Sequence, residues 1–161
     1  MNRRHFLAAT GATAIHLRSR ALFSNTAVAT QSVAKADFTL RIATVAVELA
    51  PGKIVKTTGY NGTVPGPLLR MREGVSTTVD VLNDTDTEEL VHWHGLMVPA
   101  EVDGAAEEGS PPIPAHAQRR YTFVPKPAGT RWYHTHNIAG SDLTRGMYSG
   151  QFGFLYIEPK S

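Results

Sequence analysis

From residue 37 onward, the chain alternates apolar and polar residues in short runs that are separated by turn-forming residues. The first run covers residues 38–42, a second covers residues 45–49, and Ala-Pro-Gly-Lys at 50–53 forms a turn after them. A period of two places successive side chains on opposite faces of an extended chain, which is typical of half-buried β-strands and incompatible with an amphipathic helix.

The same pattern continues through the rest of the chain, and Gly-rich and Pro-rich segments separate the runs. The longest such break is Asn61-Gly62-Thr63-Val64-Pro65-Gly66-Pro67. Seven or more short strands without an amphipathic helix predict an all-β Greek-key β-sandwich. The further predicted strands are residues 54–60, 68–72, 76–83, 91–96, 119–124, 130–136 and 150–157.

The N-terminal segment has the features of an export signal. Arg3 and Arg4 directly precede an apolar, Ala-rich stretch at 6–17, and Ala-Val-Ala at 27–29 has the small-x-small form of a cleavage site. These features predict a twin-arginine-type signal over residues 1–29 and a periplasmic location for the remainder. Basic residues just beyond the apolar stretch leave an alternative open, a short basic amphipathic helix at a cytoplasmic N-terminus.

The charge balance and the residue types missing from the chain exclude several function classes. The net charge is +2, but four of the 16 basic residues lie in the first 20 positions. Residues 30–161 carry 12 basic and 14 acidic residues, so we expect no nucleic-acid partner. No run of about 18 apolar residues occurs, so we expect no membrane span. The 161 residues contain no cysteine, and any metal ligands must therefore be histidine or carboxylate.

Four of the seven histidines form two His-x-His pairs, His92-Trp93-His94 and His134-Thr135-His136, and each pair lies on a predicted strand. Residues i and i+2 of a strand point to one face, so each pair presents two imidazoles together and directs the middle residue to the other face. If the two strands are neighbours, the four imidazoles converge.

Imidazole clusters of this kind suit a metal ion. Neutral imidazole binds copper, zinc, iron and nickel, and without thiolates the Irving–Williams order favours Cu(II). The alternative for a single His-x-His pair is two half-exposed surface residues without a ligand role. Of the other histidines, His5 and His16 belong to the predicted signal, and His116 lies in a Pro-rich loop where we expect it to be exposed.

Three motifs resemble first-domain signatures of the multicopper oxidases, in the order that this family has them. They are Val91-His92-Trp93-His94-Gly95-Leu96, Val102-Asp103-Gly104 and Gly129-Thr130-Arg131-Trp132-Tyr133-His134-Thr135-His136. The break at 61–67 and the segment Arg-Gly-Met-Tyr-Ser-Gly at 145–150 resemble the family's flanking segments. The resemblance covers residues 38–159 and is greatest to laccases and periplasmic copper-efflux oxidases. It implies a plastocyanin-like cupredoxin domain over residues 37–159.

The resemblance also implies roles for individual residues. His92 matches a ligand of the type 2 copper, and His94, His134 and His136 match ligands of the paired type 3 coppers. In the family, such a trinuclear cluster reduces dioxygen to water with electrons from a type 1 copper. Asp103 matches a carboxylate that passes protons to reduced oxygen. An Asx-turn before Gly104 is the alternative reading of this aspartate.

The chain departs from the family in lacking the other half of the ligand set. The family's H-x-x-H-x-H motif and its HCH segment, which also supplies the type 1 ligands, are absent from the 161 residues. We therefore expect a truncated or split multicopper oxidase that is inactive until a second polypeptide carrying the remaining domains completes the cluster. The alternatives are a stand-alone periplasmic copper-binding or sequestering protein and a non-functional gene remnant.

Overall fold

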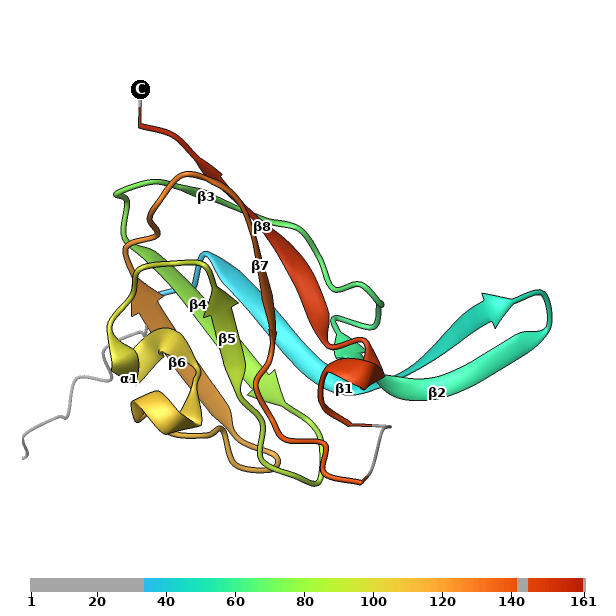
Figure 1. Cartoon of the computed structure of the whole chain (residues 1–161). Coiled ribbons are helices and arrows are strands. Elements are labelled where there is room, and N and C mark those ends of the chain that lie inside the picture. Colours follow the sequence, from blue (N-terminus) through green and yellow to red (C-terminus); the bar gives the residue numbers. More distant parts are fainter. Residues whose placement is uncertain (1–33, 142–144, 161) are drawn as a thin grey trace, which may run out of the picture. The chain divides into compact units, whose positions relative to one another are not determined.

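Two four-stranded β-sheets form the framework of the domain in a computed structural model that describes residues 34–141 and 145–160 (Figure 1). One short helix, α1, and two 3-10 turns at Ala106–Glu108 and Gly146–Ser149 lie in the connections. The strands are β1 (Phe38–Ala50), β2 (Lys53–Tyr60), β3 (Leu69–Arg72), β4 (Thr77–Asn83), β5 (Val91–His94), β6 (Gln118–Phe123), β7 (Gly129–Thr135) and β8 (Phe152–Glu158), and α1 covers Ala100–Asp103.

The strand order is β2-β1-β4-β6 in one sheet and β3-β8-β7-β5 in the other. The β1–β4 and β3–β8 pairs are parallel, and the remaining pairs are antiparallel. The alternating runs at 38–42 and 45–49 belong to a single long strand with two partners, because β1 pairs with β4 up to Ile42 and with β2 from Ile42 onward. The predicted all-β sandwich is thus confirmed.

Aromatic side chains join the two sheets in the core. Trp93 of β5 and Tyr133 of β7 are fully buried. The Trp93 ring lies 5.5 Å from the ring of Tyr121 and 5.0 Å from that of Phe123, both of which belong to β6 of the opposite sheet. Such aromatic pairs contribute about 0.5–1.5 kcal/mol each beyond the burial of their surface. The residue between the first two histidines is therefore anchored in the core, which directs both histidines outward.

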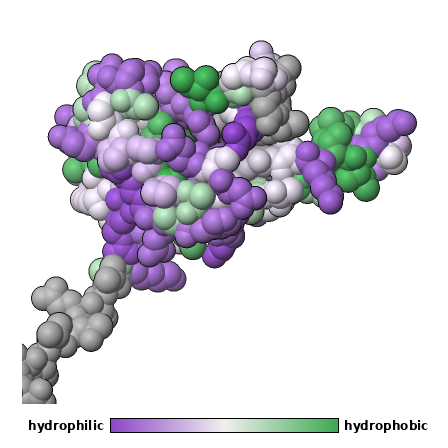
Figure 2. Space-filling model, turned by 90° about the horizontal axis from the view of Figure 1, so that it is seen from below, coloured by the Kyte–Doolittle hydropathy of each residue, from purple (hydrophilic) through white to green (hydrophobic). Residues whose placement is uncertain are grey.

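The β1–β2 hairpin extends beyond the two sheets (Figure 1). Its outer end carries the exposed apolar side chains of Leu49, Ile54 and Val55. Figure 2 shows apolar surface on this projecting arm at the right, whereas hydrophilic residues dominate the rest of the visible face. The hairpin lies at the β2 edge of its sheet, away from the strands that carry the histidine pairs.

One predicted strand ends earlier than expected. We predicted a strand over 91–96, but β5 ends at His94 because Gly95 adopts a left-handed conformation with φ 80°. The chain then turns into a loop that contains α1, a helix that the sequence pattern did not indicate. No helix within residues 34–141 and 145–160 has the length and apolar character required to cross a bilayer.

Candidate metal centre

The two histidine pairs lie on neighbouring strands of one sheet. In the antiparallel register of β5 and β7, His92 lies directly opposite His134, and His94 lies opposite Trp132. His136 follows the end of β7, and its backbone N–H donates to the carbonyl of Leu90 at 3.2 Å, which extends the pairing by one step. The register therefore places all four imidazoles on the outer face of the sheet.

The His92 ring occupies the middle of this group, which we call the histidine cluster: His92, His94, His134 and His136. Its centroid lies 5.4 Å from that of His94, 5.2 Å from that of His134 and 5.3 Å from that of His136. One ring nitrogen from each of His92, His94 and His134 lies within 4.8 Å of the other two. Three side chains are thus close enough to share one coordination region.

Hydrogen bonds select which ring nitrogen of two histidines faces the cluster. Nδ1 of His92 donates to the backbone carbonyl of Asp103 at 2.9 Å, and Nδ1 of His134 donates to the carbonyl of Thr135 at 2.8 Å. A neutral imidazole has one protonated nitrogen, so both rings keep Nε2 as the lone-pair donor. Nε2 of His134 lies 3.3 Å from Nδ1 of His94. Outward-facing hydrogen bonds of this type fix the ring orientation of metal-ligating histidines.

His136 occupies a separate position at the edge of the cluster. Its ring centroid lies 6.0 Å from that of His134, and it is not among the three residues whose ligand atoms converge. Nδ1 of His136 lies 3.6 Å from a carboxylate oxygen of Glu107, in the 3-10 turn that follows α1. Nδ1 thus faces Glu107, and Nε2 lies on the other side of the ring.

His134 is the buried member of the cluster, with 5% of its surface exposed. The Trp132 ring stacks on it at 4.1 Å and 30°. Burial lowers the pKa of His134 below its usual value, and positive charge on the three neighbouring histidines lowers this pKa further, against an opposing hydrogen bond to Thr135. The ring is therefore held in the neutral form, which is the form that binds a metal ion.

The loop that contains Gly104 places Asp103 in contact with His92. Gly104 has φ 84°, and a Cβ at this position would lie 1.9 Å from the carbonyl oxygen of Val91, so no larger residue fits. The Gly104 N–H donates to the hydroxyl of Ser110 at 2.8 Å, and this hydrogen bond ties Gly104 to the later part of the same loop. Besides the backbone hydrogen bond, the Asp103 carboxylate lies 3.2 Å from Nδ1 of His92. This aspartate thus contacts the cluster directly.

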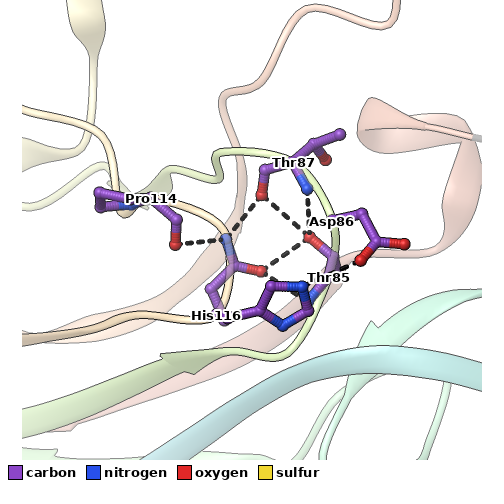
Figure 3. Close-up of polar contacts among 6 residues, drawn as sticks. Thr85, Asp86, Thr87, Pro114 and His116 are labelled. Carbon is purple, nitrogen blue, oxygen red and sulfur yellow. Dashed lines mark hydrogen bonds and ion pairs between the residues drawn. The ribbon is translucent and has the colours of Figure 1, made fainter.

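The turn before β5 is held by the buried side chain of Asn83. Its amide donates to the carbonyls of Thr87, Ile113 and Pro114 at 2.7, 3.1 and 3.0 Å. The contacts around Thr85, Thr87 and Pro114 are drawn in Figure 3. They fasten the segment that leads into β5 to the loop before β6, and this fixes where the first histidine pair begins.

His116 lies in this second loop and is 64% exposed in its side chain, as we predicted. Its Nε2 contacts the carboxylate of Asp86 at 2.9 Å (Figure 3). His116 therefore offers a surface histidine outside the cluster. His5 and His16, together with the predicted signal at 1–29, lie outside the described residues.

Sequence reasoning missed two acidic residues near the cluster, Glu89 and Glu107. Glu89 is buried and accepts a hydrogen bond from the hydroxyl of Thr135, the middle residue of the second pair. An inward-pointing Thr135 was predicted from the period of two, but its partner was not. Glu89 and Glu107 each belong to an acidic pair in a connecting segment, Glu88-Glu89 and Glu107-Glu108, which is typical of solvated loops.

The fold and this cluster define a metal-binding all-β domain with an imidazole-rich, thiolate-free donor set. The chain belongs to the multicopper oxidase family, since the family model described as "Multicopper oxidase" matches residues 41–161. Copper is the cofactor that this membership gives the chain, and the donor set fits it because neutral imidazoles favour Cu(II) over the other divalent first-row ions.

Individual relatives agree with this assignment. The chain is 32% identical over 123 residues to multicopper oxidase mco of Staphylococcus aureus, covering 76% of this chain and 26% of the relative. It is 36% identical over 112 residues to copper resistance protein A of Escherichia coli, covering 70% of this chain and 18% of the relative. The solved multi-copper oxidase from Pseudomonas thermotolerans superposes with a TM-score of 0.68 at 34% identity, covering 79% of this chain and 31% of that structure.

The solved blue copper oxidase from Nitrosomonas europaea is similar to the same degree. Its TM-score is 0.67 at 32% identity, over 77% of this chain and 39% of that structure. These structural relatives confirm a cupredoxin-like domain. The chain spans 16% to 26% of the length of the curated relatives that it matches.

Proposed function

We propose that this domain donates half of the ligands of a trinuclear copper site in a laccase-like multicopper oxidase. In this proposal His92 binds the type 2 copper, and His94, His134 and His136 bind the type 3 coppers. The observation that carries the proposal is the strand register, which sets His92 opposite His134 and brings one ligand atom from each of three histidines within 4.8 Å of the others. Two unrelated surface motifs would not be expected to lie on the same face of a sheet and directly opposite each other in its strand register.

The contacts around the cluster support different roles for its members. Nδ1 of His94 and Nε2 of His134 approach to 3.3 Å, a separation that suits two donors to one ion. His92 and His136 each direct Nδ1 away from the cluster, toward Asp103 and Glu107, and so offer Nε2 at separate positions. This division matches one type 2 ligand and a set of type 3 ligands.

Copper at such a site supplies the one-electron steps by which dioxygen is reduced to water. Among the residues of this chain, Asp103 is the one that we propose moves protons there. Its carboxylate contacts His92 at 3.2 Å and is partly exposed, so it is within reach of the cluster directly or through one water molecule. The 161 residues hold no cysteine, so the thiolate of a type 1 site has to come from residues outside this sequence.

Copper stoichiometry of the purified chain tests the proposal. We expect at most one or two bound Cu(II) ions, because the cluster presents ligands on one side only. His92→Ala combined with His94→Ala removes most of this binding, whereas His116→Ala, at the exposed histidine outside the cluster, leaves it unchanged. Full copper content in the double variant would show that the cluster is not the site.

A second candidate function is copper binding without turnover. The exposure of His94 supports it, because the cluster is accessible to an ion without any further polypeptide. We expect the copper-loaded chain to show no intense blue thiolate absorption and no catalysed oxygen reduction with phenols or Cu(I). Oxidase activity that appears only with a second polypeptide supplying the missing ligands would favour the first candidate. Activity of the chain alone that is abolished by the His92 and His94 double substitution would contradict both.

We also propose that the domain works in the periplasm after twin-arginine export. The support is the sequence of residues 1–29, with its paired arginines and apolar stretch. Arg3→Lys combined with Arg4→Lys is expected to leave precursor in the cytoplasm, as followed by cell fractionation. Unchanged periplasmic accumulation of this variant would reject the proposed route.

A further inference from the structure

Glu89 is a buried carboxyl that the proposed ligand set does not use. It lies three residues before His92 and is 5% exposed. A buried carboxyl is costly unless hydrogen bonds compensate for its lost hydration, so its partners indicate why it is retained. Burial raises the pKa of Glu89, while the hydrogen bond from Thr135 and the charge of Arg145 act in the opposite direction.

The partner that connects Glu89 to the cluster is Thr135, which stands between two of the proposed ligands. Oε2 of Glu89 accepts a hydrogen bond from the Thr135 hydroxyl at 3.0 Å. The same hydroxyl oxygen accepts the backbone N–H of Asn137 at 3.1 Å. The Thr135 carbonyl accepts Nδ1–H of His134 at 2.8 Å. Glu89 thus sets the rotamer of Thr135, whose hydroxyl and carbonyl accept hydrogen bonds from Asn137 and His134.

Hydrogen bonds fix the backbone around Glu89, so the position of its carboxyl group is fixed as well. Its N–H and carbonyl exchange two hydrogen bonds with Ile113 at 2.9 and 2.8 Å. The Asn137 side chain donates to the carbonyl of Glu88 at 2.8 Å, and the His136 N–H donates to that of Leu90. Segments 88–90 and 135–137 are therefore fastened side by side, with the Glu89–Thr135 hydrogen bond buried between them.

We propose that Glu89 is a positioning residue that acts through Thr135 to hold His134 and His136 in their ligating orientations. The proposal rests on the proposed copper site. If the Glu89 acceptor is lost, the Thr135 hydroxyl has no buried acceptor and its rotamer is released. The Asn137 N–H then loses its acceptor, and the backbone that carries His136 loses its constraint. Hydrogen-bond partners of this kind typically contribute 10–100-fold to metal affinity.

Matched substitutions test the role. Glu89→Leu and Thr135→Val remove the acceptor and the donor with little change in volume, whereas Glu89→Gln and Thr135→Ser retain them. We expect the first two variants to weaken Cu(II) binding by roughly 10-fold or more. The second two are expected to restore it to within about 3-fold, a difference below one hydrogen bond's typical contribution. Affinity is measured by competition with a chelator of known affinity, and the copper environment by the hyperfine splitting of the Cu(II) EPR spectrum.

A destabilised control separates positioning from general stability. Ile157 is fully buried but pairs with Gly129, five residues from His134 along β7. Ile157→Ala is expected to lower the unfolding temperature without changing the affinity or the EPR spectrum. The Glu89→Leu, Thr135→Val double variant is expected to bind no more weakly than either single variant, because the two remove one interaction.

The outcomes distinguish this inference from the proposed function. If the wild-type chain binds no Cu(II), or if the His92 and His94 double substitution leaves binding intact, the proposed copper site fails. If the wild-type chain binds through these histidines and both Glu89→Leu and Thr135→Val retain wild-type affinity and spectrum, only the positioning role is overturned. Should Glu89→Leu not fold, Thr135→Val and its rescue by Thr135→Ser decide the question.

Discussion

The two His-x-His pairs share one motif but are supported in opposite ways. The first pair lies on β5, at the edge of its sheet, where His94 is exposed and His92 is held from outside by the loop that carries Asp103. The second pair lies at the end of β7, which runs between β5 and β8; its first member, His134, is buried and donates a hydrogen bond to the carbonyl of the residue after it. His92 depends on a loop for its support, and His134 depends on the sheet.

This difference shows what local spacing determines and what the fold determines. The period of two directs both members of a pair to one face wherever the strand lies. Burial, pKa and hydrogen-bond partners depend on the neighbouring strands, and these differ between an edge and an interior position. We therefore expect the first pair to fail when its loop is disturbed and the second pair to fail when its own packing is removed.

The largest expected effect is on the loop that supports the first pair. In Gly104→Ala the new Cβ would lie 1.9 Å from the carbonyl oxygen of Val91, at a positive φ, so we expect a loss of about 3 kcal/mol or more in unfolding free energy. Gly109 also has a positive φ, but no heavy atom lies within 4 Å of an added Cβ. Gly109→Ala is the matched control and is expected to cost about 1 kcal/mol.

Chemical denaturation of the two glycine variants measures this difference. Equal losses in the two variants would mean that the approach of Gly104 to β5 is unimportant and that only the left-handed backbone matters. A larger loss for Gly104→Ala, with reduced Cu(II) binding in the folded fraction, would show that the loop and the first pair form one unit.

The next effect concerns the histidines themselves. His134→Ala removes a buried ring that stacks on Trp132 and bonds to Thr135, so we expect the unfolding free energy to fall by about 1–3 kcal/mol. His94→Ala removes an exposed ring and is expected to change stability by less than about 0.5 kcal/mol. Thermal and urea unfolding of the metal-free variants tests this. Similar losses in both would remove the distinction between the pairs.

Much of this arrangement could be predicted from the sequence. The rest could not, because it depends on contacts between residues that are far apart in the chain or on neighbouring strands. The alternation around Trp93 indicated a strand with a buried tryptophan and outward histidines, and β5 has both. The burial of His134 was not predicted because it depends on Trp132 stacking from the same strand and on β5 beside it. The contact of Glu89 was not predicted because its partner, Thr135, is 46 residues away along the chain.

A third prediction uses the lowered pKa of His134. Because the folded state disfavours protonation of this ring, protons bind more readily to the unfolded chain, and the stabilising effect is complete above the ordinary value of 6.5. Stability is then lost as the pH falls through 6.5 toward the folded-state pKa. The unfolding temperature of the metal-free chain is expected to fall over this range, and the fall is expected to be smaller in His134→Asn. If the pH profile of His134→Asn is as steep as that of the unsubstituted chain and the profile of His94→Asn is flatter, the pH dependence comes from the first pair and the prediction is wrong.

The smallest expected effect is that of the Asp103 side chain on copper binding by the chain alone. His92 bonds to the backbone carbonyl of Asp103 at 2.9 Å, and this bond remains in Asp103→Asn. The carboxylate is the more distant partner at 3.2 Å, so we expect the Cu(II) affinity to fall by less than about 10-fold, the lower end of the loss typical for removing a ligand's hydrogen-bond partner. Chelator competition measures this. A greater loss would mean that the negative charge of Asp103, and not the backbone, holds His92, and the first pair would then depend on the ionisation of Asp103 as well as on the loop that carries it.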